Sequence, residues 1–436
     1  MKTFKLGGIH PKPQKFAAHA PLEMFPLPKK GVVLLTQHIG TPAAPVVAKG
    51  DKVKVGQLLG RAEAFMCANV HSPYSGTVTE VGWAKDAGGI PRTAVYIDVE
   101  GDEWLETIDR TPEVKRECEL EASEIVAKLK EMGVVGLGGA TFPTHIKYSI
   151  PEGKHADYLL INGVECEPYL SGDGRLMVEH TEELMVGISI LQKALNGVPV
   201  IVGIECNKPH AIMQMEHLAA QFKDIRIEPL KMKYPQGGEK QLIDALTGRR
   251  VPSGKLPIDV GCVVSNVSTA YAVYEAVQKN KPLVERLVTV TGKDMTSQHN
   301  YKIRLGIPLK DVIQRAWGEL PDGTEKVISG GPMMGKAICN LDSPIVKGSA
   351  SILVMPKRTS HRGVETNCIR CGKCVKACPM GLEPYMFSLV LHAGQLRKAA
   401  ELHLLDCLEC GCCQWSCPAN KPLVDEIRLG KQKLRR

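Results

Sequence analysis

The chain has 436 residues, of which 44% are hydrophobic and 23% are charged, and its formal net charge is +8. This length exceeds one ordinary core and predicts about two to four domains, while no apolar run approaches the ~20 residues of a membrane-spanning helix. The first residues lack the apolar segment of a secretory signal, so we expect a cytoplasmic chain whose fifteen cysteines serve metal or redox chemistry rather than disulfides.

The first 115 residues predict a small all-β unit, because short alternating apolar runs are separated by turns rich in glycine and proline. Its centre is similar to biotinyl and lipoyl carrier domains in the segments GDKVKVGQLLG (50–60) and VHSPYSGTV (70–78). Carriers present a lysine at the hairpin between such segments, but Phe65 lies near that tip here and no lysine does. We therefore expect a barrel-sandwich scaffold without a swinging arm.

Residues 116–281 have an α/β pattern. ASEIVAKLKEMG (122–133) has helical spacing, whereas ADYLLING (156–163) and VPVIVGIE (198–205) have the length and composition of buried strands. Residues 207–222 fit a crossover helix between parallel strands. The following segment, residues 282–356, predicts a small β-rich module with one helix.

Two cysteine runs near the end of the sequence carry the strongest chemical signal. Residues 368–379 read CIRCGKCVKACP and residues 407–418 read CLECGCCQWSCP, and both fit C-x2-C-x2-C-x3-C-P. Three thiolates at this spacing can wrap three corners of an iron–sulfur cubane while the fourth projects away, so two such runs exchange their fourth ligands. One predicted [4Fe–4S] cluster is held by Cys368, Cys371, Cys374 and Cys417, and the other by Cys407, Cys410, Cys413 and Cys378.

Zinc is the main alternative for these cysteines, but zinc sites usually consist of two CxxC pairs rather than two four-cysteine runs ending in Cys-Pro. The segment between the runs has helical spacing, so we expect a helical two-cluster domain over residues 357–436. Cys412 breaks the repeat and is assigned no ligand role. Most of the six cysteines outside the runs are expected to be small core residues.

The loop VVGLGGATFPTHIKY (134–148) is similar to a dinucleotide-binding fingerprint, but Thr141 occupies the third glycine position. Its glycines let backbone amides approach an anion or a ring, and Pro143 fits the first position of a helix. Two other stretches carry suitable polar groups, INGVECEPYL (161–170) after a predicted strand and SNVSTAYAV (265–273) at a predicted helix start. Taken singly, each stretch reads as an ordinary turn, helix cap or solvated edge.

Taken together, GLGGATFPTHIKY, INGVECEP, YPQGGEKQLI and SNVSTAYAV resemble the NADH-oxidising flavin subunit of respiratory complex I. That resemblance implies FMN contacts from Gly136, Gly138, Lys147, Asn162, Glu165, Asn266 and Thr269. It implies NADH contacts from Phe142 and Glu167. Tyr234 and Glu239 lie in a matching segment with altered spacing. Leu137 and Val164 depart from that family, because they stand where it has a basic and an acidic residue.

Nearly the whole chain is similar to the RnfC family, whose members are subunits of the Rnf ion-translocating electron-transport complex, through GGIHP, GGATFPTH, NGVECEPYL and CIRCGKCVKACPMGL in family order. The resemblance implies a multidomain α/β and β chain. Its expected domains are a barrel-sandwich hybrid (1–115), a Rossmann-like FMN/NADH domain (116–281), a β-grasp SLBB module (282–356) and a ferredoxin domain with two [4Fe–4S] clusters (357–436).

The function implied by this resemblance is electron transfer between NADH, non-covalently bound FMN and the two clusters, with no catalytic acid or base because the cofactors do the chemistry. The implied partners are other Rnf subunits, both membrane-embedded and ferredoxin-like, with the chain peripheral on the cytoplasmic face of the cell membrane and without nucleic acid. A cobalamin reductase of the propanediol-utilisation type and a non-catalytic iron–sulfur wiring subunit are the alternatives. Covalent attachment of FMN at Thr144 is a further reading of the same loop.

Overall fold

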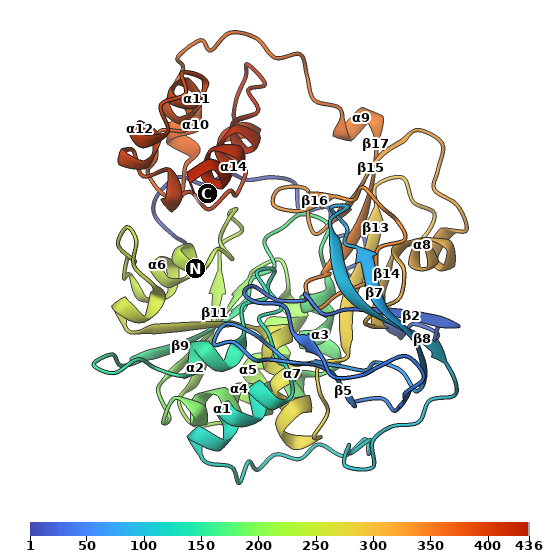
Figure 1. Cartoon of the computed structure of the whole chain (residues 1–436). Coiled ribbons are helices and arrows are strands. Elements are labelled where there is room, and N and C mark those ends of the chain that lie inside the picture. Colours follow the sequence, from blue (N-terminus) through green and yellow to red (C-terminus); the bar gives the residue numbers. More distant parts are fainter. Residues whose placement is uncertain (435–436) are drawn as a thin grey trace.

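The computed structural model describes residues 1–434, which form four sheets and a C-terminal group of helices (Figure 1). In Figure 1 the C-terminal helices, drawn in red, lie above an α/β unit drawn in green, and the blue β unit lies to one side. None of the helices within residues 1–434 combines the length and the apolar composition needed to cross a bilayer.

The N-terminal β unit consists of two small sheets with the strand orders β2-β8-β7-β4 and β3-β5-β6. Its strands are β2 (Lys30–Leu34), β3 (Ala44–Pro45), β4 (Lys52–Val53), β5 (Leu58–Arg61), β6 (Val70–His71), β7 (Gly76–Lys85) and β8 (Pro91–Val99). Phe65 lies between β5 and β6 with 78% of its surface exposed. The expected hairpin tip is therefore present and carries an aromatic side chain rather than a lysine.

The first 25 residues do not join this barrel, although the sequence suggested one unit from residue 1 to 115. Lys2 forms a parallel bridge with Leu230, and Ile9 forms an antiparallel bridge with Tyr234. Strand β1 (Leu22–Met24) pairs in parallel with β14 (His299–Arg304) of the β-rich unit. We call residues 1–25 the N-terminal strap, because they run along the outside of three other parts of the chain.

The α/β unit has a parallel four-stranded sheet in the order β11-β10-β9-β12, with helices on both faces. Alternate residues of β9 divide between the two cores, since Leu159 and Ile161 pack under one helical layer and Leu160 under the other. The elements are β9 (Tyr158–Gly163), β10 (Val200–Glu205), β11 (Ile225–Leu230), β12 (Cys262–Asn266), α1 (Ala122–Glu131), α2 (Thr144–Tyr148), α3 (Gly172–Glu179), α4 (Thr181–Ala194), α5 (Pro209–Ala219), α6 (Glu239–Thr247) and α7 (Val267–Gln278).

Local sequence explains several of these boundaries. Glu121 and Glu124 form a capping box at the start of α1, and Asn266 caps α7 by accepting bonds from the amides of Ser268 and Thr269. Pro143 precedes α2 as its cap instead of occupying the first helical position, so the boundary we expected is wrong by one residue. The crossover helix expected over residues 207–222 is present as α5.

The β-rich unit is a six-stranded mixed sheet in the order β1-β14-β13-β17-β15-β16, with one helix as the sequence predicted. Its core is continuous with that of the barrel, since Val33 and Leu59 belong to the same buried cluster as Val290 and Ile352. The remaining elements are β13 (Glu285–Gly292), β15 (Thr324–Ser329), β16 (Lys336–Ala337), β17 (Ser351–Pro356) and α8 (Leu309–Trp317).

The C-terminal unit is helical, as expected from the spacing between the cysteine runs. Its helices are α9 (Lys357–Ser360), α10 (Lys373–Ala377), α11 (Pro384–His392), α12 (Leu396–Glu401), α13 (Cys412–Trp415) and α14 (Leu423–Leu434). A small core around Phe387, Leu404 and Ile427 holds α11, α12 and α14 together. Of the six cysteines outside the runs, Cys67 and Cys262 are fully buried in cores and Cys118 and Cys166 pack against cores, as expected for most of them.

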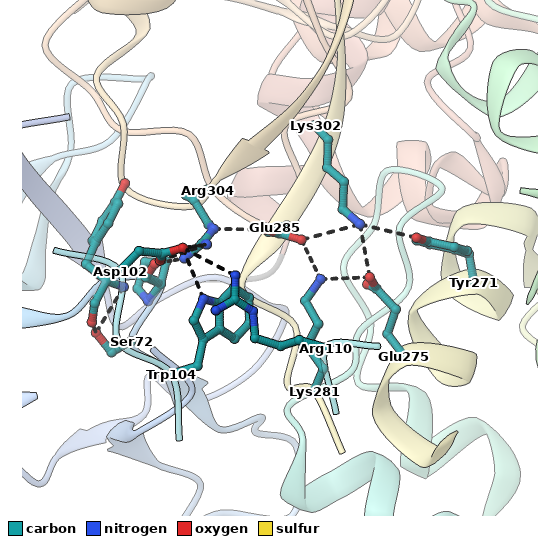
Figure 2. A network of polar contacts seen from close by, with 12 residues as sticks. Ser72, Asp102, Trp104, Arg110, Tyr271, Glu275, Lys281, Glu285, Lys302 and Arg304 are labelled. Carbon is teal, nitrogen blue, oxygen red and sulfur yellow. Dashed lines mark hydrogen bonds and ion pairs between the residues drawn. The ribbon is translucent and has the colours of Figure 1, made fainter. Parts of the chain in front are cut away.

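A buried network of charged side chains joins the barrel, the α/β unit and the β-rich unit (Figure 2). Glu285 of β13 accepts a 2.9 Å bond from Arg304 Nε and also pairs with Lys281 and Lys302. Arg304 in turn reaches Asp102 at 3.1 Å. Burial alone would raise the pKa of the Glu285 carboxyl, but these three cations hold it well below its usual range. Their attraction therefore outweighs the cost of burying the carboxylate.

We expect Glu285→Gln to lower the free energy of unfolding by about 3 kcal/mol, because it leaves three buried cations with too little negative charge. Thermal unfolding followed by circular dichroism, under the same anaerobic conditions for variant and wild type, measures the change. Glu100→Gln is the control, because the Glu100 carboxylate pairs with Lys52 on the surface and such pairs contribute at most about 1 kcal/mol. If both variants lose the same free energy of unfolding, the buried network around Glu285 does not contribute more to stability than a surface ion pair.

Lys347 is a second buried contact between units. Its side chain is fully buried, and Nζ donates to the carbonyls of Asn69 (2.8 Å) in the barrel and Gly133 (2.7 Å) in the α/β unit. No carboxylate within residues 1–434 forms an ion pair with it. Burial therefore lowers the pKa of Lys347 from the usual 10.5 to about 7.

This pKa makes stability depend on pH in a defined direction. Between pH 7 and about 10.5 the unfolded chain binds a proton at Lys347 that the folded chain has lost, so the unfolding free energy rises with pH by about 1.4 kcal/mol per unit. We expect Lys347→Met to remove this slope, measured as thermal midpoints from pH 7 to 10. Lys336→Met, on the exposed strand β16, is the control and should keep the wild-type slope. If K347M also keeps the wild-type slope, the lowered pKa of Lys347 is not the cause of the pH dependence.

Candidate functional site

The glycine loop, residues 136–142, connects α1 to α2 and is closed at its base by short backbone bonds. Gly136 N donates to Phe142 O at 2.8 Å, and Val135 bridges to Pro143. The tip residues Gly138, Gly139 and Ala140 are exposed, while Phe142 is half-buried. Gly139 has φ +122°, a conformation that favours glycine. The base is therefore fixed and the tip faces outward.

Neighbouring units hold this loop from both sides. Leu137 N donates to Thr269 Oγ1 at 2.8 Å, and Arg286 Nη2 of the β-rich unit donates to Leu137 O at 2.7 Å. Ile39 of the barrel donates its amide to Thr141 O at 3.2 Å. Helix α7 of the same unit and two other structural units thus contribute to the shape of a seven-residue loop.

The carboxyl ends of the parallel strands lie directly beside the loop. Asn162 of β9 and Asn266 of β12 are paired in register. A Cβ atom added to Gly138 would lie 3.3 Å from Asn266 Cβ, and one added to Gly237 would lie 3.6 Å from Asn162 Nδ2. Two glycine segments therefore converge on the two asparagines at the edge of the sheet, where α/β folds bind ligands.

Charged residues predicted from the sequence surround the same edge. Lys147 Nζ lies 2.9 Å from Glu239 Oε1 and 3.0 Å from Val264 O. The Glu165 carboxylate accepts a 2.8 Å bond from Asp173 N and has Lys15 and Lys208 within 3.9 Å. Burial is the main cause that raises the pKa of Glu165, and the two lysines oppose it.

Glu167 and Tyr234 contact the β-rich unit and the C-terminal unit. The Glu167 carboxylate accepts bonds from the amides of Met333 (3.1 Å) and Met334 (2.7 Å), and burial raises its pKa to about 7. Tyr234 is buried, and its hydroxyl donates to Cys410 O at 2.8 Å. The side chains of these two residues thus form contacts with other structural units, while their backbone neighbours remain beside Glu165 and Asn162.

Three residues that we did not predict also support this region. Asp173 Oδ2 accepts a 2.7 Å bond from Asn266 Nδ2 and its other oxygen accepts from Ser268. Lys15 of the N-terminal strap donates to the carbonyls of Glu165 (2.8 Å) and Glu167 (2.9 Å). Arg286 is the third. Only Asp173 lies near a recognised motif, so its position in the first turn of α3 could have indicated it.

Five cysteines line one cavity in the C-terminal unit: Cys412 and the four predicted ligands Cys378, Cys407, Cys410 and Cys413. Two backbone amides point at their sulfurs, with Leu382 N 3.4 Å from Cys378 Sγ and Glu409 N 3.3 Å from Cys407 Sγ. Burial and the neighbouring thiols together raise the pKa of Cys413. Four thiols around one cavity, with amides directed at sulfur, suit an iron–sulfur cluster.

The other four cysteines lie nearer the surface. Cys368 and Cys371 are exposed, while Cys374 and Cys417 are half-buried and close enough to interact. Among residues 1–434, no three His, Cys, Asp or Glu side chains are spaced to hold a single metal ion. The thiolates of a four-iron cubane stand farther apart than the ligands of a single zinc ion.

The cavity containing Cys378 lies directly against the α/β unit. Besides the Tyr234 bond to Cys410, Gln241 Nε2 donates to Pro379 O at 3.3 Å, and Gly8 of the strap donates to Ala377 O at 2.9 Å. A Cβ added to Gly411 would lie 3.1 Å from Met333 O of the β-rich unit. The inner cysteine set is thus bound to three parts of the chain.

Three segments of the chain match models of known protein families. Residues 2–102 match the family model "RnfC Barrel sandwich hybrid domain", residues 129–275 the "Nuo51 FMN-binding domain" and residues 367–421 the "4Fe-4S dicluster domain". The chain is 44% identical to a subunit of the proton-translocating ferredoxin:NAD(+) oxidoreductase complex of Clostridium ljungdahlii, over 100% of this chain and 94% of the relative. The chain belongs to the RnfC family.

Other members of the RnfC family match over equally long stretches. A subunit of the Na(+)-translocating ferredoxin:NAD(+) oxidoreductase complex of Acetobacterium woodii is 39% identical over 99% of this chain and 97% of its own length. A subunit of the ion-translocating oxidoreductase complex of Rhodobacter capsulatus is 40% identical over 100% of this chain and 84% of its own length. The expected family is confirmed.

The family models cover the two regions built above. In this RnfC-family chain, the FMN-binding match contains the glycine loop and the strand edge, and the 4Fe–4S match contains both cysteine runs. The residues fit these groups, because exposed loop amides beside paired asparagines suit a flavin nucleotide and the inner four thiols share one cavity. An FMN-binding domain and an iron–sulfur domain are thus present in one chain.

Proposed function

We propose that this chain is the cytoplasmic NADH/FMN/iron–sulfur electron-transfer subunit of a membrane-bound ion-translocating ferredoxin:NAD oxidoreductase. The contact between the inner cysteine cavity and the α/β unit is the observation that carries this function, because electron transfer needs the two sites side by side. FMN, when bound, converts between the two-electron chemistry of NADH and the one-electron chemistry of the clusters.

The chain's own residues have distinct tasks in this proposal. Gly136 and Gly138 leave room at the loop, and Asn162 and Asn266 offer amide groups at the strand ends. Glu165 and Thr269 fix the surrounding backbone through Asp173 and Leu137. Lys147, which bonds to Glu239, is proposed to contact FMN, and the half-buried ring of Phe142 is proposed to contact NADH.

Glu167 and Tyr234 receive a different task from the one first expected. Their bonds to Met333, Met334 and Cys410 support a role at the contact between the α/β unit and the inner cluster set. We infer that they hold the inner set in position against the α/β unit, rather than contacting NADH directly.

The two cluster sets take different places along the route. The inner set, Cys378, Cys407, Cys410 and Cys413, is adjacent to the α/β unit, so we assign it as the cluster proximal to the flavin. The outer set, Cys368, Cys371, Cys374 and Cys417, includes two exposed cysteines and is assigned as the distal cluster. Exposure suits exchange of single electrons with another protein.

The domain boundaries follow the same proposal. We place a barrel-sandwich hybrid at 1–115, a Rossmann-like FMN/NADH domain at 116–281, an SLBB module of β-grasp type at 282–356 and the ferredoxin domain at 357–436. The N-terminal strap belongs to the first segment in sequence but packs on the others.

The names of the relatives support the choice of partners. They describe subunits of complexes that translocate protons or sodium ions and react with ferredoxin and NAD. We propose that this chain binds other Rnf subunits, including membrane-embedded ones and a ferredoxin-like one. Its place is then peripheral, on the cytoplasmic face of the cell membrane.

One anaerobic experiment tests this function. Iron, sulfide and flavin contents of the purified chain are measured first, and an NADH titration is then followed at flavin and cluster wavelengths. We expect non-covalent FMN that acid releases, two [4Fe–4S] clusters, and bleaching of both chromophores by NADH. Clusters without FMN would support a non-catalytic wiring subunit. Flavin that stays with the polypeptide after acid denaturation would support covalent attachment at Thr144. Reduction of cob(III)alamin by NADH as fast as reduction of a dye would support a cobalamin reductase.

A further inference from the structure

Arg286 is a buried cation that reaches the glycine loop from another structural unit. It lies on β13 with 4% of its surface exposed, and its Nη2 donates to Leu137 O at 2.7 Å. Its Nε is buried and has no hydrogen-bond partner within residues 1–434. A guanidinium held with so few partners costs free energy, so its presence at this loop calls for a function.

The bond from Arg286 fixes the orientation of the next peptide group. Thr269 Oγ1 accepts from Leu137 N on the other side, so both backbone groups of Leu137 are occupied. A trans peptide is planar, and the carbonyl of one residue points opposite to the amide of the next. Because Leu137 O points toward Arg286, Gly138 N–H points away from it.

The amide of Gly138 therefore faces the open side of the loop. Gly138 is exposed, and within the described residues 1–434 its N–H donates to no acceptor. Asn266 lies beside it and Asp173 lies behind Asn266. The charge of Asp173 acts on Arg286, but its carboxylate accepts hydrogen bonds from Asn266 and Ser268 and forms no ion pair with Arg286 within residues 1–434.

We propose that Arg286 is a positioning residue for the flavin site: it turns the Gly138 amide outward and adds positive potential beneath it, so that the loop binds an electron-rich oxygen of the flavin nucleotide. The oxygen belongs either to the phosphate or to the ring system, and both share this chemistry. The inference rests on the proposed function, because it concerns the same FMN site.

The test compares Arg286→Gln with Arg286→Lys and with the matched control Arg304→Gln. Arg304 is also a buried arginine of the same sheet, but its partners Glu285, Asp102 and Pro73 lie away from the loop. Flavin-free protein with intact clusters is titrated with FMN and with riboflavin, and the midpoint potential of the bound flavin is measured.

We expect R286Q to weaken FMN binding about tenfold or more, R286K to recover part of this loss, and R304Q to lower the thermal midpoint without changing either flavin measurement. If R286Q weakens FMN binding but leaves riboflavin affinity unchanged, the bound oxygen belongs to the phosphate, which riboflavin lacks. If R286Q weakens binding of FMN and riboflavin equally and lowers the midpoint potential of the bound flavin, the bound oxygen belongs to the ring system. If R286Q does not fold, R286K must still weaken FMN binding for the proposal to stand.

Two failures remain distinguishable. A wild-type chain that binds neither FMN nor riboflavin refutes the flavin site itself and with it the proposed function. A wild-type chain that binds FMN, together with R286Q and R286K variants of unchanged affinity and potential, refutes only the role of Arg286.

Discussion

Replacing Cys378 with serine should remove the cluster next to the flavin region, although Cys378 belongs to the first cysteine run. The other cysteines that line the cavity containing Cys378 all belong to the second run: Cys407, Cys410, Cys412 and Cys413. We therefore expect C378S to lose about half of its iron, to keep FMN, and to keep the distal cluster. NADH should still reduce the flavin, but reduction of the remaining cluster should be abolished because the proximal carrier is missing.

Cys374→Ser is the matched variant, since Cys374 lies only four residues earlier in the same run. It should also lose about half of its iron, but its remaining cluster is the proximal one and should still be reduced by NADH. Iron content, electron paramagnetic resonance and stopped-flow absorbance measure these outcomes. Cys412→Ser should keep both clusters, because Cys412 lines the cavity but breaks the ligand spacing. Identical behaviour of C378S and C374S would show that the runs do not exchange ligands.

Replacing Gly138 with leucine should abolish FMN binding while leaving both clusters intact. A Cβ atom at this position already lies 3.3 Å from Asn266 Cβ, so alanine fits tightly and the larger leucine side chain must project over the exposed face of the loop. We expect FMN affinity to fall at least about 100-fold, which corresponds to about 2.7 kcal/mol.

Gly88→Leu provides the control for this change. Gly88 also lacks a positive φ, and an added Cβ would meet one atom, Asp86 Oδ1, at 3.3 Å. It lies in the β7–β8 hairpin of the barrel, away from the glycine loop. Flavin fluorescence after acid release and iron content measure the two cofactors. Full FMN occupancy in G138L would mean that this loop does not bind the flavin.

The parts of this structure that depend on local sequence could be predicted. The apolar runs of β9 and β10, the cap at Asn266 and the helices between the cysteine runs follow from periodicity and capping chemistry. The cavity that Cys378 shares with cysteines of the second run agrees with the exchange of fourth ligands that the spacing predicts.

The rest depends on contacts between distant residues. Lys15 and Arg286 reach the flavin region over about 150 residues, and neither lies in a motif whose spacing could indicate it. Glu167 matched a family motif, but its side-chain direction is set by the amides of Met333 and Met334 in another unit. Local patterns therefore indicated which residues gather at the site, whereas tertiary packing decides which way each one points.

The N-terminal strap has a consequence for the order of events during synthesis. Gly8 donates to Ala377 O, and the residue that follows Ala377 is the proposed ligand Cys378. At about 5–20 residues per second, the ribosome needs roughly 20–75 s to make the stretch between them, so the strap cannot form this contact until that time has passed. Docking of the strap is then a late step in maturation, close in time to the delivery of iron and sulfide.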